Sequence, residues 1–230
     1  MYDSGDERCA LSGDTTFRGL MGGWWKEMTD GWRSKELEAG DPLIFQGSSS
    51  NEVFAVQRGA LRIERWEDDR DQPAVLAFRA SDDLVGETPM IEPEAPRTAQ
   101  VVAHTRVVVL VGQAERLNRF LVLKKAERLL TTYLAHRAHE MSVVQGRGDA
   151  EVRLATLVRP LVRDQLRKTG GRTGQVVLKV SRDHLAQGLQ LGHRRARGLL
   201  DDLWIGRFHS KGMLTIDLAR WAERVSGLRG

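Results

Sequence analysis

Short segments in which hydrophobic and polar residues alternate fill much of the first half of the chain. Residues 53–56, 60–66 and 74–78 are rich in branched and aromatic side chains, and turn-forming glycine, aspartate and serine separate them. Residues 101–111 add two more such segments with a break between them. Because many short strands at regular spacing are typical of sandwiches and barrels, this region predicts a jelly-roll β-barrel.

Two longer segments outside this region have a helical period. Residues 17–28 place apolar side chains three or four apart, weakened by Gly22-Gly23. Trp24, Trp25 and Trp32 are expected to pack on the barrel, and the alternative is a ligand cage. Residues 113–144 carry a second apolar stripe, with a possible break near residues 120–123. The stripe consists of Leu123, Ala126, Leu130, Tyr133, Met141 and Val144. It favours pairing of two chains in a coiled coil, and the alternative is packing on the barrel of its own chain.

The remainder of the chain alternates helices with short strands. Residues 146–149 are rich in glycine, break the long helix and are expected to form a hinge. A helix over 150–168 and a strand over 175–180 follow. Ser181 is suited to cap the next short helix, which a turn near Gln190 ends.

A second helix is expected from His193 to about Trp204, and residues 207–216 predict a two-stranded wing with Lys211 at its turn. The helix has two distinct faces. Its apolar face consists of Ala196, Leu199, Leu200 and Leu203. The opposite face bears His193, Arg194, Arg197 and Asp201, with Arg195 beside them. Such a helix suits the major groove of DNA, where arginine pairs guanine through two hydrogen bonds, and the alternative is a solvated basic face.

The charge of the chain is divided unevenly along its length. Residues 1–145 carry 18 Lys/Arg and 23 Asp/Glu, whereas residues 146–230 carry 17 and 8. The net charge is therefore −5 in the first part and +9 in the second, which indicates that the second part meets a polyanion. Cys9 is the only cysteine, which suits a reducing cytosol, and no run of about 18 apolar residues indicates a membrane span.

The stretch from Gly86 to Ala99 has residues that suit one phosphate and one ribose. Arg97 offers two donors in the geometry of phosphate oxygens, and Thr98 adds a hydroxyl. Thr88 before Pro89 predicts the N-cap of a short helix, whose free N–H groups favour an anion. Glu87 could accept hydrogen bonds from ribose hydroxyls. The alternative is a proline-rich surface loop in which Glu87 and Arg97 form an ion pair.

This stretch resembles the phosphate-binding cassette of the cyclic nucleotide-binding domain. The shared pattern is Gly-Glu, ten residues from the glutamate to an arginine, then Ser/Thr-Ala and a strand. The resemblance implies that Glu87 binds the ribose 2′-hydroxyl and that Arg97 and Thr98 bind the cyclic phosphate. It extends over the barrel through an E-x-G-D-x-L-I-x-Q-G pattern that begins at Glu38, followed by Arg58-Gly59.

Residues 181–203 resemble the winged helix-turn-helix of the cyclic-AMP receptor protein/fumarate-nitrate regulator (Crp/Fnr) family. The shared pattern is S-R-D-H-L-A-Q-x-L, then R-x-L-L-x-x-L. The resemblance implies that Arg182 holds backbone phosphate and that three residues read bases, namely His193, Arg194 and Gly198. Because those positions are often Arg, Glu and Arg in the family, a different operator is expected.

In members of this family that respond to cyclic AMP, a Thr-Ser pair on the long helix meets the adenine. In this chain the segment between the barrel and the DNA-binding head is a few residues shorter. If the shortening lies before the helix, Ala138-His139 take the place of the pair, and if it lies in the hinge, Met141-Ser142 do. His139 and Ser142 share a helical face and are the candidates here. Neither alternative reproduces the pair, so the phosphate and ribose half of the site has the stronger support.

These observations predict an α+β protein with four parts. Residues 1–121 form the β-barrel domain, 122–145 the dimerisation helix, 146–149 the hinge and 150–230 the winged helix-turn-helix domain. The expected function is a cytoplasmic, homodimeric transcription regulator that binds a palindromic operator in double-stranded DNA and contacts RNA polymerase. Its expected effector is cyclic AMP or another cyclic nucleotide, with no prosthetic group and no metal.

Two alternatives stay open. A regulator of the same fold could ignore cyclic AMP, either because it is constitutive or because it responds to another nucleotide such as a cyclic dinucleotide. A nucleotide-metabolising enzyme is disfavoured, because the sequence shows no Ser-His-Asp or Cys-His arrangement, no H-E-x-x-H and no P-loop lysine.

Overall fold

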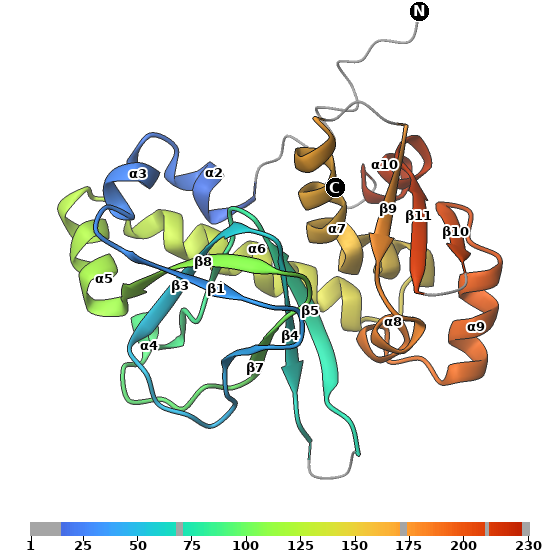
Figure 1. The fold of residues 1–230 in the computed structure, drawn as a ribbon, viewed down its shortest axis with the longest axis horizontal. Helices are drawn as coiled ribbons and strands as arrows, with labels where there is room; N and C mark the ends of the chain where they lie inside the picture. The colour runs from blue at the N-terminus through green and yellow to red at the C-terminus, as the bar shows by residue number, and fades with distance from the viewer. Residues whose placement is uncertain (1–14, 68–70, 171–173, 210–211, 227–230) are drawn as a thin grey trace, which may run out of the picture. The chain divides into compact units, whose positions relative to one another are not determined.

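The computed structural model describes residues 15–67, 71–170, 174–209 and 212–226 (Figure 1). The described chain divides into two compact units. The first runs from Thr15 to Ala138, and the second begins at His139. The long helix α6 (Glu127–Gln145) starts in the first unit and ends in the second.

Two short helices open the first unit. They are α2 (Phe17–Met21) and α3 (Trp24–Met28). Thr16 caps α2 by accepting a hydrogen bond from the N–H of Gly19, and Gly22 ends it in a left-handed conformation at φ 53°. The glycine pair therefore divides the helical pattern of residues 17–28 into two helices, because only glycine adopts this φ without strain.

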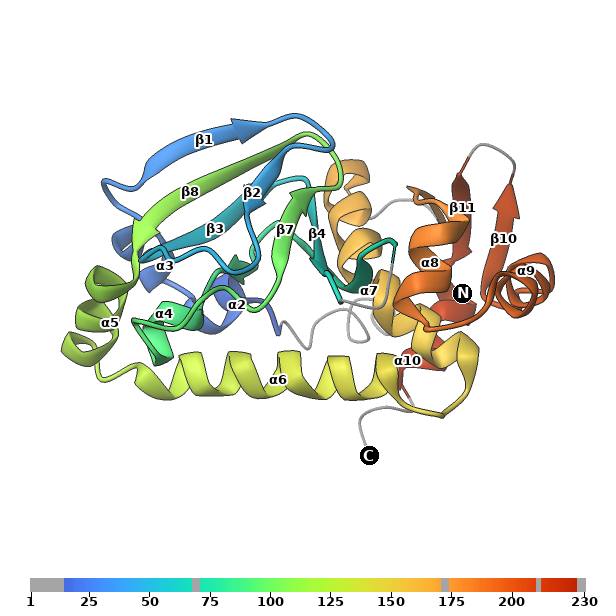
Figure 2. The same ribbon diagram turned by 90° about the horizontal axis from the view of Figure 1, so that it is seen from below.

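The strands of the first unit form two antiparallel four-stranded sheets, which Figure 2 shows above helix α6. In order, the first sheet contains β1 (Arg33–Leu37), β8 (Val107–Gln113), β3 (Glu52–Arg58) and β6 (Leu84–Val85). The second contains β2 (Pro42–Ile44), β7 (Gln100–Ala103), β4 (Ala60–Arg65) and β5 (Ala74–Ala80). The expected jelly roll is thus present as two sheets rather than as one closed barrel.

Strand β3 is buried on both of its faces, and this explains its continuous apolar run. Phe54 and Val56 belong to the core between the two sheets, together with Leu61 of β4. Val53 and Ala55 point the other way, into a core shared with the helices. Because side chains alternate along a strand, one apolar segment can serve two cores.

Helices cover the outer side of the first sheet. These are α2, α3, α4 (Thr88–Ile91), α5 (Ala114–Leu123) and the first part of α6. The expected break in the long helix lies at residues 124–126, where Lys125 has φ 52°. The indole ring of Trp32 packs against Gly112. Any side chain at position 112 would clash with it, because a Cβ there would lie 2.3 Å from the ring. The predicted packing is thus confirmed for Trp32 and for the partly buried Trp25, whereas Trp24 is 39% exposed.

The middle of the predicted apolar stripe packs on its own β-sandwich, as the alternative interpretation held for these positions. Ala126 and Tyr133 are buried in the core between helix and sheet. These two residues are therefore not free to form a coiled-coil seam, whereas Leu123 and Met141 of the same stripe are exposed, and the pairing of two chains stays a prediction. The outward face of α6 carries small residues instead, among them Thr131, Ala135 and Ala138.

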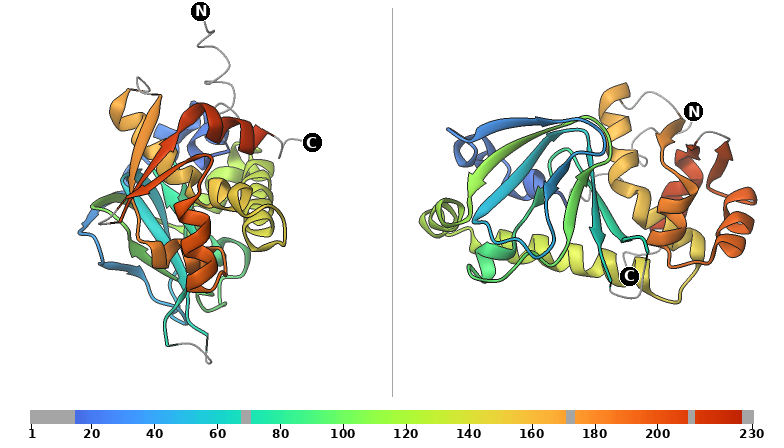
Figure 3. Two further views of the ribbon diagram at one scale, coloured as in Figure 1. Left: turned by 90° about the vertical axis from the view of Figure 1, so that its right-hand side faces the viewer. Right: turned by 60° about the horizontal axis from the view of Figure 1, so that its bottom comes forward.

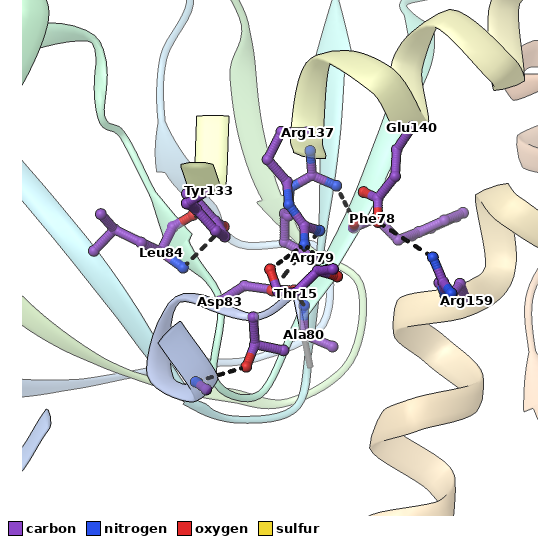
Figure 4. Close-up of polar contacts among 12 residues, drawn as sticks. Thr15, Phe78, Arg79, Ala80, Asp83, Leu84, Tyr133, Arg137, Glu140 and Arg159 are labelled. Atoms are coloured by element: carbon purple, nitrogen blue, oxygen red, sulfur yellow. Dashed lines mark hydrogen bonds and ion pairs between the residues drawn. The ribbon is translucent and has the colours of Figure 1, made fainter. Parts of the chain in front are cut away.

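Polar contacts fix α6 to the strand that precedes the candidate cassette (Figure 4). The hydroxyl of Tyr133 donates to the carbonyl of Leu84 at 2.8 Å and accepts from its N–H at 3.1 Å. Arg137 lies over the ring of Tyr133, donates to the carbonyl of Thr15 at 2.7 Å and approaches the carboxylate of Asp83 at 3.9 Å. Burial raises the pKa of Tyr133, so its hydroxyl stays protonated and can donate.

The second unit joins four helices to a three-stranded sheet (Figure 3). After α6 come α7 (Ala150–Thr169), β9 (Gln175–Lys179), α8 (Arg182–Gly188) and α9 (His193–Asp201). β10 (Gly206–His209), β11 (Met213–Asp217) and α10 (Leu218–Ser226) complete it, and the antiparallel sheet has the order β10-β11-β9. Helix α7 continues through Pro160. The sequence pattern did not predict α10, which packs through the buried Trp221 on the carbonyl of Ala155.

Candidate functional site

The cassette begins at a glycine that the local geometry requires. Gly86 has φ 77°, and a Cβ there would lie 3.1 Å from Ile44 and 3.2 Å from a guanidinium nitrogen of Arg97. Helix α4 follows at once, with Glu87 and not Thr88 as its N-cap. The predicted cap is thus wrong by one residue. Because Pro89 then occupies the second helical position, its missing N–H still costs the helix no hydrogen bond.

Arg97 is buried and binds its own chain. Only 4% of the residue is exposed, and its guanidinium donates to the carbonyls of Gly86 at 2.7 Å, Ser50 at 2.8 Å and Glu52 at 2.6 Å. Burial lowers the pKa of Arg97, while Glu87 and Glu52 act in the opposite direction. The Nε–H is buried without a hydrogen-bond partner among the described residues. The predicted phosphate ligand is therefore held inside the domain, with its Nε–H unpaired.

The other cassette residues surround this arginine. Gly86 and Glu87 lie beside Arg97 in space, and both are half-buried, as is Thr88. Thr98 is exposed. The cassette therefore combines a buried cation with polar side chains that solvent can reach.

The two residues considered for an adenine lie in the other unit. His139 and Ser142 belong to α6 beyond the division at Ala138, and both are exposed. The structure thus brings Gly86, Glu87 and Arg97 together and leaves His139 and Ser142 in a separate unit.

The helix-turn-helix has the expected elements. The hydroxyl of Ser181 accepts from the N–H of His184 at 3.0 Å and caps α8, as predicted. Gln190 takes a left-handed conformation at φ 53° in the turn. Helix α9 then begins at His193, as expected, and ends at Asp201 rather than near Trp204.

Helix α9 has a buried apolar face and an exposed basic face. Ala196 and Leu200 are buried in the second unit. The exposed face carries Arg194, Arg195, Arg197 and Gly198. A Cβ at position 198 would meet no heavy atom within 4 Å, so this part of the helix is open to a partner. The side chain of His193, and Lys211 as a whole, lie outside the described residues.

Arg182, the candidate phosphate ligand, is anchored within the head. It donates to Asp201 at the end of α9 at 2.8 Å and lies 4.5 Å above the ring of Phe208 in the wing. Its side chain is half-buried. Asp201 was predicted to lie on the exposed face of α9. Its pairing with Arg182 was not predicted, since the two residues are 19 positions apart.

A further exposed cation, Arg207, lies on the wing and was not among the predicted ligands. In β10 the burial alternates, with Phe208 inward and Arg207 and His209 outward. This period of two is the sequence signal that could have identified Arg207 as a solvent-facing residue.

Comparison with known proteins shows the same architecture. Residues 34–122 match the family model of the cyclic nucleotide-binding domain. No curated protein matched the chain. One similar solved structure is TTHA1359, a CRP/FNR-family transcriptional regulator from Thermus thermophilus, which is 18% identical to this chain. The match covers 84% of this chain and 98% of TTHA1359, with a TM-score of 0.60.

Two further solved structures have similar values. FixK2 from Bradyrhizobium japonicum is 19% identical, and the match covers 86% of this chain and 98% of FixK2, with a TM-score of 0.61. The c-di-GMP responsive global regulator CLP from Xanthomonas campestris is 18% identical, with coverages of 83% and 96% and a TM-score of 0.59.

The fold defines a class, in which a cyclic nucleotide-binding domain precedes a winged helix-turn-helix. Within that class, the chain has the fold of the Crp/Fnr regulators, which confirms the resemblance and the fold class predicted from the sequence.

The described residues include neither a metal-binding group of side chains nor a membrane-spanning helix. No group of three or more His, Cys, Asp or Glu among them is placed to hold a metal ion. No helix in the same residues is long and apolar enough to cross a bilayer.

Proposed function

We propose that this protein is a homodimeric, cytoplasmic transcription regulator that binds a palindromic DNA operator and is controlled by a cyclic nucleotide in its β-sandwich. The observation that carries the proposal is helix α9, which exposes Arg194, Arg195 and Arg197 while its opposite face is buried in a winged helix-turn-helix. Arginines in this arrangement reach base edges in a major groove. Activation would include contact with RNA polymerase.

The dimer interface would use the outward face of α6. Thr131, Ala135 and Ala138 are exposed there, and small side chains let two helices approach closely. Ala135→Glu would place a charge in that interface and convert the dimer to a monomer in analytical ultracentrifugation. Arg119→Glu, a substitution at an exposed arginine of α5, serves as the comparison for a change of charge away from this face. A variant Ala135→Glu that stays dimeric would remove this face from the interface.

A second candidate is a regulator of the same fold that does not respond to cyclic AMP. The specific observation in its favour is Arg97, whose guanidinium already binds three backbone carbonyls. A cyclic phosphate would have to compete with these bonds or use the remaining Nε–H. A larger ligand such as a cyclic dinucleotide, to which CLP responds, could supply more contacts.

Selection of bound DNA from a random pool tests both candidates. The selection is run at one fixed salt concentration, because affinity for DNA depends steeply on salt, and with and without cyclic AMP. A palindrome that is enriched only with cyclic AMP supports the first candidate, and the same palindrome in both pools supports the second. A third pool contains a cyclic dinucleotide, and the absence of any enriched sequence in all three pools would reject both. Arg97→Ala should abolish a response to cyclic AMP, so an unchanged response would reject the cassette as its site.

A further inference from the structure

The first turn of α7 carries two buried side chains of opposite charge. Glu151 and Arg153 are each 8% exposed. They lie just after Asp149, the N-cap of the helix. The carboxylate of Asp149 accepts hydrogen bonds from the N–H groups of Glu151 at 2.8 Å and Val152 at 3.0 Å. Burial of a charge is costly unless hydrogen bonds compensate it. The partners of these two residues therefore indicate what they stabilise.

Arg153 binds the ends of two other helices. Its Nε–H donates at 2.8 Å to the carbonyl of Val144, in the last turn of α6, and an Nη–H donates to the carbonyl of Leu189, which ends α8. Carbonyls in the last turn of a helix lack partners within it, and the negative end of the helix dipole favours a cation. Burial and the nearby Arg195 lower the pKa of Arg153, but a guanidinium remains protonated at neutral pH.

Glu151 binds the segment that leaves α9. One carboxylate oxygen accepts from the N–H groups of Trp204 and of Ile205, the latter at 3.3 Å. The other oxygen pairs with Arg224 of α10 at 3.2 Å. Arg224 also lies 5.0 Å above the ring of Trp204, so the same chain segment is held from two sides.

Both ends of the helix that faces DNA are thus fixed by one turn of α7. Arg153 holds the residue that starts the turn before α9, and Glu151 holds the two residues that link α9 to the wing. Both side chains are buried, so neither can contact DNA itself. We propose that Glu151 and Arg153 are positioning residues that fix the orientation of α9 relative to the end of α6, and that sequence-specific DNA binding depends on them. This inference rests on the proposed DNA-binding function.

The test compares Arg153→Met, Arg153→Lys and Glu151→Gln with the wild type, all as full-length protein. Arg167→Met, at an exposed arginine in the last turn of the same helix, is the control. The affinities for the selected operator and for unrelated DNA are measured on the same preparation, because their ratio does not depend on the fraction of folded protein.

We expect Arg153→Met to lower the ratio of specific to non-specific affinity about tenfold to a hundredfold, because both of its bonds come from a charged donor. The slope of affinity against salt should stay unchanged, because no phosphate contact is lost. Arg153→Lys should recover part of the ratio, since one ammonium cannot reach both carbonyls in the geometry of the guanidinium. Arg167→Met should leave the ratio unchanged. A parallel loss of both affinities, or an unchanged ratio in Arg153→Met, would overturn the proposal.

Hydrogen exchange of the free protein separates this inference from the proposed function. The N–H groups of Trp204 and Ile205 should exchange at least about tenfold faster in Glu151→Gln, because a neutral amide binds them more weakly. Unchanged exchange at these positions would overturn the positioning role even if the protein binds DNA. If the wild type selects no operator but the exchange rises as expected, the proposed function fails while the positioning of α9 by α7 stands.

Discussion

The two arginine sites of this protein differ in what they bind. In the cassette, Arg97 is buried and donates to three carbonyls of its own domain, whereas Arg194 and Arg197 on α9 are exposed. The same side chain is therefore part of the fold in one place and available to a partner in the other. The comparison shows that an arginine at a motif position is a candidate to bind a phosphate or a base. Its burial and its hydrogen bonds then decide whether the guanidinium is available to that partner.

The largest expected effect comes from removal of the buried arginine. Arg97→Met removes the donor of three partly buried hydrogen bonds, to the carbonyls of Gly86, Ser50 and Glu52, and a hydrogen bond contributes about 1 kcal/mol to stability. We expect the free energy of unfolding of this domain to fall by about 3 kcal/mol, measured by urea denaturation.

Arg33→Met is the matched control, because that arginine is exposed and pairs with Glu52 only at 3.6 Å. Its removal should change stability by less than about 1 kcal/mol. If Arg97→Met were equally mild, the buried arrangement of Arg97 would not hold in the ligand-free protein, and the contrast between the two sites would disappear.

Removal of an exposed arginine should affect DNA binding rather than stability. Arg194→Ala is expected to weaken operator binding by about 1–3 kcal/mol, the value of one good pair of hydrogen bonds to a base. The free energy of unfolding should change by less than about 0.5 kcal/mol, because the side chain is exposed. Fluorescence anisotropy with labelled operator measures the first quantity and denaturation the second. A loss of stability with unchanged DNA affinity would reverse the assignment of this face.

A smaller effect is expected where the long helix meets the strand before the cassette. Tyr133→Phe removes the two hydrogen bonds to Leu84 and should cost about 1 kcal/mol. Because burial raises the pKa of Tyr133 in the folded state, the unfolded chain releases this proton first. Wild-type stability should therefore be complete below pH about 10, the pKa of an exposed tyrosine, and fall as the pH rises above it. The decline should be weaker in Tyr133→Phe, and equal declines would show that Tyr133 does not contribute.

The smallest effect on the fold is expected at the exposed end of the cassette. Thr98→Ala should leave the free energy of unfolding within about 0.5 kcal/mol of the wild type, because the residue is exposed. If the cassette binds a cyclic phosphate, the same variant should weaken binding of the nucleotide about fivefold, the value of one neutral hydrogen bond. Isothermal titration with cyclic AMP measures this change. A nucleotide that binds the variant and the wild type equally would not use Thr98.

Local signals predicted much of the fold. The cap at Ser181, the apolar face of α9 and the glycine break after α2 were all readable in the sequence, because each depends on residues within one or two turns of helix. The short strand β6 and the helix α10 were missed. The first is two residues long, and the packing of the second depends on Trp221 reaching α7, 66 positions away along the chain.

The sequence by itself determined the order of most strands and helices, the basic charge of the second half and the residues of the cassette and of α9, because these follow from periodicity, caps and residue types. Only the tertiary structure decided the direction of the α6 stripe and the state of Arg97. Tyr133 faces Leu84, and Arg97 reaches Ser50 and Glu52, across 45 to 49 positions of the chain. No local pattern encodes these contacts, because they arise when distant segments are buried together and their polar groups must find partners.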